Sequence, residues 1–270
     1  MPALDDPIAF SLGPIDVRWY ALFILLGIAC GLALSYWLAG KRGYDPGFLL
    51  DLSPWLVFLS IAGARTYYVL LEWDYFRDNL GQAINIRSGG LSIHGGIVAG
   101  ILVVIVFCRI YQQPTLTWMD IIVPGLALAQ AIGRWGNWAN QEAFGKPADL
   151  PWAVTIDPDR RPAGYEQSAT FHPTFLYESI FNLGNAALLS WLVLRMPRTS
   201  WMRPGDVGAI YLIAYGVGRF AIERMRTDSL YIGSLPAAYW LSMLMIGGGV
   251  ILMVLTRTMF RSNEPVSEIA

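Results

Sequence analysis

A polar cluster follows an apolar run in the stretch AIGRWGNWANQEAFGKP, which comes directly after MDIIVPGLALAQ. On a helix, Arg134, Asn137 and Gln141 have the spacing i, i+3 and i+7, which predicts one shared face. An arginine fork matches a phosphate group through two parallel hydrogen bonds. The stretch therefore predicts a site for a phosphate-bearing molecule. The alternative is a structural network in which Arg134 pairs with Glu142 or with backbone carbonyls.

Aromatic residues and glycines are interleaved with these polar side chains. Trp135 and Trp138 lie on another side of the same predicted helix, where they suit a belt at a membrane interface. Gly133 and Gly136 have no Cβ, so we expect another backbone or a lipid headgroup to approach closely there.

A second polar stripe occurs in YGVGRFAIERMRTDS. Its members follow one another at spacings of 4, 4 and 3 residues, which predicts one helix face: Tyr215, Arg219, Glu223 and Arg226. Arg219 lies deep enough in the apolar run to require a partner. Arg224 instead suits a belt of snorkelling arginines on anionic lipid, and that belt is the alternative interpretation of the whole stripe.

His94 stands in RSGGLSIHGGIVAG, near the start of another apolar run. Imidazole exchanges protons near neutral pH, so His94 is a candidate general base. A hydrogen-bonded packing role among the surrounding glycines is the alternative. Gly96 and Gly100 form a pair of small residues at helical spacing, which favours close packing against another helix.

The stretch FHPTFLYES combines a turn with polar side chains. We expect Thr174 to be the N-cap of the helix that follows. Glu178 enters that helix and requires a cationic partner, because an unpaired charge in a membrane is costly. We expect His172 and Glu178 to have structural rather than catalytic roles.

The composition indicates which elements must position these residues. The 270 residues are 55% hydrophobic and only 14% charged, with a mean hydropathy of +0.44, whereas about a quarter of a typical soluble domain is charged. Eleven tryptophans and thirteen tyrosines fit two membrane interfaces. The net charge of −1 gives no electrostatic support for nucleic-acid binding. Cys30 and Cys108 lie in apolar runs, where we expect core or lipid-facing thiols.

A membrane-spanning helix needs about 20 apolar residues. The chain contains seven such ranges, which predict an all-α integral membrane protein: Val17–Ala39, Phe48–Leu71, Leu91–Tyr111, Met119–Trp138, Phe175–Arg195, Val207–Glu223 and Ala237–Leu255. The proline-rich connection 139–174, with a short strand in WAVTID, is expected to form a small extramembrane head between the fourth and fifth helices. We expect residues 1–270 to form a single polytopic domain.

Lysine and arginine counting, with the head set aside, favours a cytoplasmic C-terminus and an outward-facing head. With alternating helices, Arg134, Arg219, Tyr20 and His94 then fall in the outer half of the bundle. Several arginines near the outer leaflet are expected to face an anion, and a phospholipid headgroup is the obvious one. Tyr20 could equally belong to an interface belt.

Other chemistries find little support in the sequence. The two histidines are far apart and no carboxylate–histidine spacing recurs, so we expect no metal site. A serine-hydrolase elbow and a nucleotide-binding glycine loop are not recognised. A lipid or anion transporter would also gather arginines, although the inverted repeats typical of transporters are not apparent. A non-catalytic membrane protein that binds anionic lipid is the third alternative.

One stretch resembles a known family signature. The run GRWGNWANQEAFG is similar to the pattern G-R-x-G-N-F-x-N-x-E-x-x-G of prolipoprotein diacylglyceryl transferases, with Trp138 in place of phenylalanine. The matching positions are Gly133, Arg134, Gly136, Asn137, Asn140, Glu142 and Gly145. The blocks HGG, HPTFLYE and YGVGRFAIERMR also resemble family blocks in the same order. The resemblance extends from about Val17 to about Leu255.

The resemblance implies a bacterial inner-membrane enzyme with seven spanning helices, a periplasmic N-terminus and head, and a cytoplasmic C-terminus. Family members transfer the diacylglyceryl group of phosphatidylglycerol to the thiol of the lipobox cysteine of a prolipoprotein, forming a thioether and releasing glycerol phosphate. No metal or organic cofactor is implied. Residues essential in the family correspond by motif to Tyr20, His94, Arg134, Asn137, Gly145 and Arg219, and important positions correspond to Glu142 and Glu223.

A mechanism for this chain follows as a hypothesis. The substrate supplies its own nucleophile, a thiol that must lose its proton, and His94 is the candidate base. Arg134 and Arg219 are expected to stabilise the charge that develops on the leaving phosphate. The expected phosphatidylglycerol-binding residues are Tyr20, Arg134, Asn137, Asn140, Glu142, Gly145, Tyr215, Arg219, Glu223 and Arg226. Among these, Glu142 and Glu223 are expected to hold the arginine forks.

Overall fold

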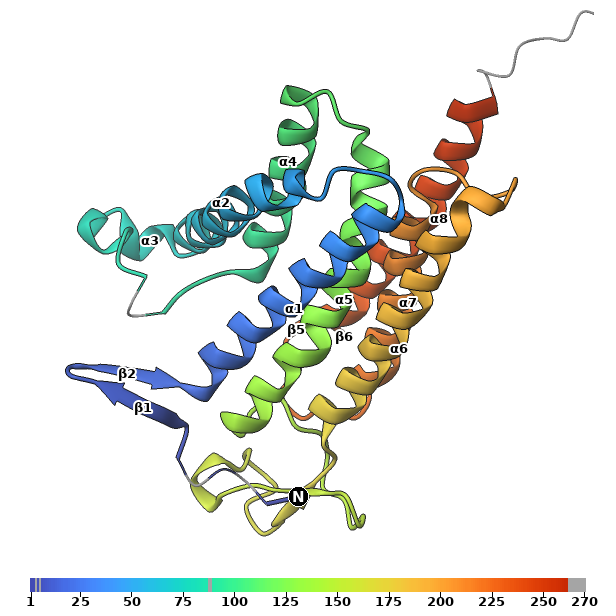
Figure 1. The fold of residues 1–270 in the computed structure, drawn as a ribbon. Coiled ribbons are helices and arrows are strands. Elements are labelled where there is room, and N and C mark those ends of the chain that lie inside the picture. The colour runs from blue at the N-terminus through green and yellow to red at the C-terminus, as the bar shows by residue number, and fades with distance from the viewer. Residues whose placement is uncertain (3, 5, 87–88, 262–270) are drawn as a thin grey trace, which may run out of the picture. The chain divides into compact units, whose positions relative to one another are not determined.

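Helices dominate the structure, a computed structural model that describes residues 1–2, 4, 6–86 and 89–261. Each of the seven apolar ranges forms a long helix in this described part of the chain (Figure 1): α1 Trp19–Lys41, α2 Gly47–Leu71, α4 Ile93–Ile110, α5 Thr115–Ala139, α6 Thr174–Arg195, α7 Asp206–Glu223 and α8 Ala237–Arg261. Shorter helical turns are α3 Trp73–Phe76, η1 Leu80–Gln82, η2 Pro158–Arg160 and η3 Met196–Arg198.

Six of these helices are long and apolar enough to cross a membrane, so the chain is a multi-pass membrane protein. The exception among the long helices of the described residues is α7. Its 18 residues include Asp206, Arg219 and Glu223, which lower its hydropathy. The prediction of seven spanning helices is therefore confirmed for six helices by length and composition, and for α7 it stays a prediction.

The chain divides into two compact units. The first unit comprises residues 1–42 and 120–270, and its helices pack at glycines. Gly31 of α1 and Gly125 of α5 bring two backbones into contact, because a Cβ on either would collide with the carbonyl group of the other. A Cβ on Gly216 of α7 would lie 2.8 Å from Ile246 Cγ1 of α8. These contacts hold the helices that carry the polar cluster at short interaxial distances.

The second unit comprises residues 43–119 and is built on the pair α2–α4. The closest approach is between Gly63 and Gly95, where an added Cβ would collide with the opposite helix. A Cβ on Gly100 would lie 3.0 Å from Ser60 Oγ, and one on Gly96 would lie 3.4 Å from Ser60 O. The predicted small-residue pair therefore does face a neighbouring helix, although the tightest contact lies one residue before it.

Three small antiparallel sheets of two strands each occur in the described residues: β1 Ile8–Leu12 with β2 Ile15–Arg18, β3 Val154–Thr155 with β4 Thr170–Phe171, and β5 Tyr231–Ile232 with β6 Leu235–Pro236. The strand expected in WAVTID is β3. The hairpins before α1 and α8 were not expected from the sequence, because each is too short to show a clear alternation of apolar and polar residues.

The connection between α5 and α6 has a small core of its own. Its buried members are Phe144, Val154, Ile156, Phe171 and Phe175. Figure 1 shows this connection in yellow-green, at the end of α5 and the start of α6. The core fixes the ends of two helices that carry candidate site residues.

Candidate functional site

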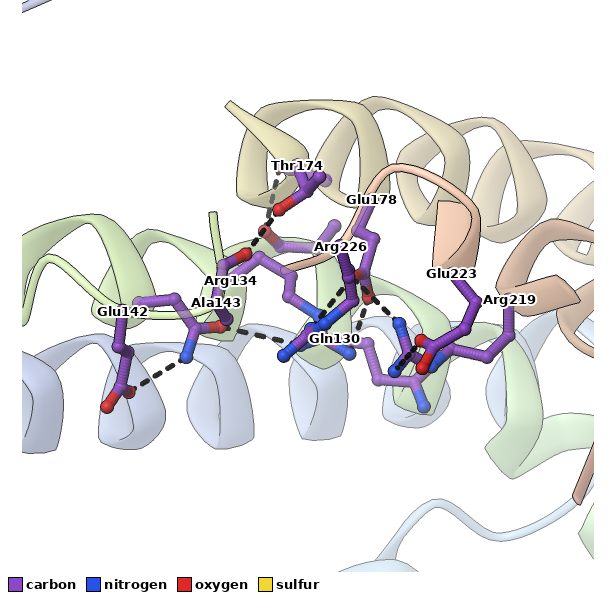
Figure 2. A network of polar contacts seen from close by, with 12 residues as sticks. Gln130, Arg134, Glu142, Ala143, Thr174, Glu178, Arg219, Glu223 and Arg226 are labelled. Carbon is purple, nitrogen blue, oxygen red and sulfur yellow. Dashed lines mark hydrogen bonds and ion pairs between the residues drawn. The ribbon is translucent and has the colours of Figure 1, made fainter. Parts of the chain in front are cut away.

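Three arginines of the first unit converge on one buried carboxylate, that of Glu178 in α6 (Figure 2). Arg134 of α5 places Nη2 2.6 Å from Glu178 Oε2. Arg219 of α7 places Nη1 3.4 Å from Glu178 Oε1, and Nη1 of Arg226, three residues beyond the end of α7, lies 3.8 Å from the same oxygen. The side chain of Glu178 is only 4% exposed. We call these four residues the Glu178 cluster.

Two further carboxylates complete the charge balance of the Glu178 cluster. Arg219 Nη2 lies 2.6 Å from Glu223 Oε2, one helical turn away, as the stripe spacing predicted. Arg226 donates two parallel hydrogen bonds to Asp228, at 2.9 and 2.7 Å. Three guanidinium groups thus meet three carboxylates. The expectation that several arginines face an external anion gains one element, because an internal carboxylate, that of Glu178, already lies between them.

The sequence interpretation assigned Glu178 a structural role, and the structure shows that it is the centre of the predicted arginine site. Its need for a cationic partner was predicted correctly from its depth in an apolar helix. The partners themselves come from α5, α7 and the turn after α7. Local spacing within α6 contains no signal for such pairs between helices, so the sequence could not identify them.

Glu142 acts on Arg134 through an amide rather than directly. Its Oε1 accepts hydrogen bonds from Asn137 Nδ2 at 2.9 Å and from Asn140 Nδ2 at 3.5 Å. Asn137 Oδ1 in turn accepts from Arg134 Nη1 at 3.4 Å. The alternative Arg134–Glu142 pair is not formed among the described residues, and the expected hold of Glu142 on an arginine fork is indirect. Glu142 instead orients the amide that contacts the guanidinium.

Two tyrosines line the same region of the first unit. The ring of Tyr20 lies against Gly136, where an added Cβ would be 2.8 Å from Tyr20 Cδ2, so this glycine does permit a close approach. Tyr20 is 38% exposed. The hydroxyl of Tyr215 lies close enough to interact with the guanidinium of Arg134. Both phenols thus lie around Arg134, at the predicted face of α5.

Other predicted neighbours of Arg134 point elsewhere. Gln141 lies beyond the end of α5 with a positive φ of 51°, and its amide exchanges two hydrogen bonds with Asp157 of the head. Trp135 donates to Ser179 Oγ at 3.1 Å, and Trp138 packs on the core of the head. The shared face of Arg134 and Gln141 is therefore wrong, because the helix ends at Ala139 and Gln141 turns towards the head, whereas the tryptophan interface belt stays a prediction.

Gly145 closes the head onto the Glu178 cluster. Its N–H donates to His172 O at 2.8 Å, and it forms an isolated antiparallel bridge with Arg226. An added Cβ would lie 2.8 Å from both His172 Cβ and Met225 O. Thr174 does not cap α6 as predicted. Pro173 is the N-cap residue, and the hydroxyl of Thr174 donates to the carbonyl of Ala143, tying the head to the start of the helix.

His94 lies in the second unit, as the second residue of α4. It is exposed, and the centre of its ring is 6.4 Å from that of Tyr67. The chain leading to it is anchored by Arg65, which the sequence interpretation missed. The Arg65 guanidinium donates to the carbonyls of Gly89 and Gly90, each at 2.8 Å, so the start of α4 has a fixed support.

The chemical capacity of the Glu178 cluster is that of an anion site. The side chains of Arg134, Arg219 and Arg226 retain 23%, 17% and 12% of their exposure, so they can accept a further partner. Guanidinium groups held by carboxylates present fixed donors to phosphate oxygens. Among the described residues, no group of three or more His, Cys, Asp or Glu side chains has the geometry of a metal site.

Comparison with known proteins identifies a family. A family model described as prolipoprotein diacylglyceryl transferase matches residues 7–255. Three relatives carry the name phosphatidylglycerol–prolipoprotein diacylglyceryl transferase. The one from Synechococcus elongatus is 46% identical over 91% of this chain and 85% of its own length. The one from Gloeobacter violaceus is 44% identical over 96% of both chains. The one from Finegoldia magna is 42% identical over 92% of this chain and 95% of its own.

Proposed function

The chain belongs to the prolipoprotein diacylglyceryl transferase family, and we propose that its Glu178 cluster binds the phosphate of phosphatidylglycerol during transfer. The enzyme is a membrane-bound transferase that moves the diacylglyceryl group of phosphatidylglycerol to prolipoproteins. The observation that carries the proposed site is the convergence of Arg134, Arg219 and Arg226 on one buried carboxylate. Such preorganised donors are what a phosphate leaving group requires.

The acceptor in this proposal is the thiol of the lipobox cysteine. The thiol gives its proton to His94, and the thiolate sulfur attacks the glyceryl carbon that carries the phosphate ester. A C–S bond forms while the C–O bond to phosphate breaks, and the electron pair stays on the phosphate oxygen. The products are the thioether and glycerol phosphate, which takes the additional negative charge. A catalytic serine or cysteine is not needed.

The arginines contribute to the rate where their contacts strengthen as the leaving oxygen gains charge. Within the protein, the arginines of the cluster are charge-balanced by Glu178, Glu223 and Asp228. Phosphate binding therefore requires the guanidinium groups to share their donors between these carboxylates and the lipid. Tyr20, Asn137 and Asn140 orient the headgroup in this proposal, and Tyr215 supports Arg134.

We further propose the bacterial inner membrane as the location, with a periplasmic N-terminus and a cytoplasmic C-terminus. Residues 1–270 then form one polytopic domain with seven spans, and residues 139–174 form a periplasmic head. Support for α7 as the additional span comes from its ion pairs, because Arg219 is neutralised by Glu178 and Glu223. Paired charges cost less in a membrane than isolated ones.

A transfer assay tests the proposed function. Purified protein in detergent is incubated with phosphatidylglycerol and a lipobox peptide containing one cysteine, and products are analysed by mass spectrometry. We expect a peptide that gains one diacylglyceryl mass, with release of glycerol phosphate. A matched peptide with Cys→Ser should gain nothing. A folded protein that binds the lipid but forms no adduct would instead support a transporter or a lipid-binding protein.

A further inference from the structure

A small cavity of about 10 Å³, with room for one hydroxyl-sized group, lies between α6 and α7, beside the Glu178 cluster. Its walls include Glu178 and Asn182 of α6 and Tyr215 and Arg219 of α7. Gly218 also lines it, and a side chain at that position would collide with the ring of Phe181. All of these residues belong to the first unit, and Arg219, which lies in the proposed phosphate site (Figure 2), also lines the cavity.

Asn182 is the unexplained residue of this cavity. It is 1% exposed, and its Oδ1 atom has no hydrogen-bond partner among the described residues. A buried carbonyl oxygen without a donor is destabilising, and most such atoms in proteins are satisfied by a partner or a bound molecule. A leucine at this position would fill the same space without that cost. The amide therefore points to a ligand that brings a donor into the cavity.

We propose that Asn182 recognises the glycerol headgroup of phosphatidylglycerol by accepting a hydrogen bond from one of its hydroxyls. This inference rests on the proposed function. With the phosphate on Arg219, the nearer headgroup hydroxyl is separated from the ester oxygen by only two carbons. A hydroxyl at that distance from the phosphate enters the cavity that Asn182 and Tyr215 line. Asn182 is thus a substrate-contacting residue that determines headgroup specificity.

The surrounding charges explain why other headgroups fit less well. A choline headgroup has no hydrogen-bond donor for Asn182 Oδ1. An ethanolamine headgroup has donors, but its ammonium group would compete with the guanidinium of Arg219 for the Glu178 carboxylate that also lines the cavity. A glycerol headgroup provides a neutral donor, which satisfies the amide without adding a cation to the cluster. A site with a buried polar group discriminates strongly against an analogue that leaves this group unpaired.

The test compares phosphatidylglycerol with phosphatidylpropanol, which has the same phosphate charge but neither headgroup hydroxyl. The kcat/KM ratio for the two lipids is measured in the transfer assay for wild type, Asn182→Leu and Asn185→Leu. Asn185 is a matched control, because it lies on α6, is 6% exposed, also has an unpartnered amide atom, and is outside the cavity wall. Asn182→Ala serves the same purpose where the leucine variant does not fold.

We expect wild type and Asn185→Leu to prefer phosphatidylglycerol by about 10- to 100-fold, as for one buried hydrogen bond. In Asn182→Leu the preference should fall to within about threefold, mainly through slower use of phosphatidylglycerol. An unchanged preference in Asn182→Leu, or no preference in wild type, would overturn the inference while leaving the transferase function intact. Absence of product from wild type with phosphatidylglycerol would instead contradict the proposed function itself.

Discussion

Arg65 in the second unit and the Glu178 cluster in the first show two ways to bury an arginine in an apolar helix. Arg65 is 7% exposed, and its guanidinium donates to the backbone carbonyls of Gln82, Ala83, Gly89 and Gly90 at 2.6–2.8 Å. It also packs on the rings of Tyr68 and Phe76. The arginines of the Glu178 cluster are held instead by side-chain carboxylates.

This difference in partners indicates which arginine can bind a ligand. Backbone carbonyls are fixed by the chain, so the donors of Arg65 are committed to holding the segment before α4. Side-chain carboxylates can share or exchange donors as a phosphate arrives. Cavity size gives the opposite ranking, because the cavity beside Arg65 has a volume of about 300 Å³ and the one beside Arg219 only about 10 Å³. The chemistry of the partners, rather than the size of the space, identifies the candidate site.

Removing the shared carboxylate should have the largest effect. We expect Glu178→Gln to destabilise the protein by about 3–5 kcal/mol, because three guanidinium groups lose a buried counter-charge. Added glycerol phosphate should recover part of the melting temperature, since an anion that binds only the folded cluster stabilises it. Thermal unfolding in detergent measures both effects. Asp74→Asn, at an exposed ion pair, is the control and should change little. A variant as stable as wild type would contradict the central place of Glu178.

Arg65→Met should have the next largest effect, on stability rather than on lipid binding. We expect a loss of about 3 kcal/mol, because four carbonyls lose a charged donor. Limited proteolysis should cut the connection between α2 and α4 sooner than in wild type, and the KM for phosphatidylglycerol should be unchanged. Arg77→Met, at an exposed arginine, provides the control. A raised KM for phosphatidylglycerol with normal stability would mean that Arg65 also contributes to lipid binding.

Glu142→Gln should have the smallest effect. The variant keeps an acceptor for Asn137 and loses only the charge that strengthens this hydrogen bond. We expect kcat/KM to fall about threefold, or about 0.7 kcal/mol. Initial rates of the transfer assay measure it. A loss of 100-fold or more would show that Glu142 contacts the substrate itself rather than orienting Asn137.

The sequence predicted the helices well and their mutual contacts poorly. Apolar length was enough to place both ends of all seven long helices to within six residues. Pairs within one helix, such as Arg219 with Glu223, follow from the helical period and were also predicted. The contact of Arg134 with Glu178 joins two helices separated by the head, and no local period encodes it.

Arg65 illustrates the second limit. It lies in the second half of a range assigned as a span, and it was not recognised. A charge within an apolar helix was the available signal. Its partners are backbone carbonyls, which every sequence has, so no pattern of residue types could have named them. Gly90 is one of the glycines that precede His94 in the sequence, and a Cβ there would lie 2.7 Å from the Arg65 guanidinium.

The measurement that tests the central claim most directly is the affinity for phosphatidylglycerol of wild type, Arg134→Lys and Arg65→Lys. Calorimetric titration with a short-chain lipid gives the Kd of each folded protein. We predict that Arg134→Lys raises Kd about tenfold, or about 1.4 kcal/mol, because an ammonium group cannot replace the guanidinium fork. Arg65→Lys should leave Kd unchanged. Wild-type affinity in Arg134→Lys, or equal weakening in both variants, would contradict the account.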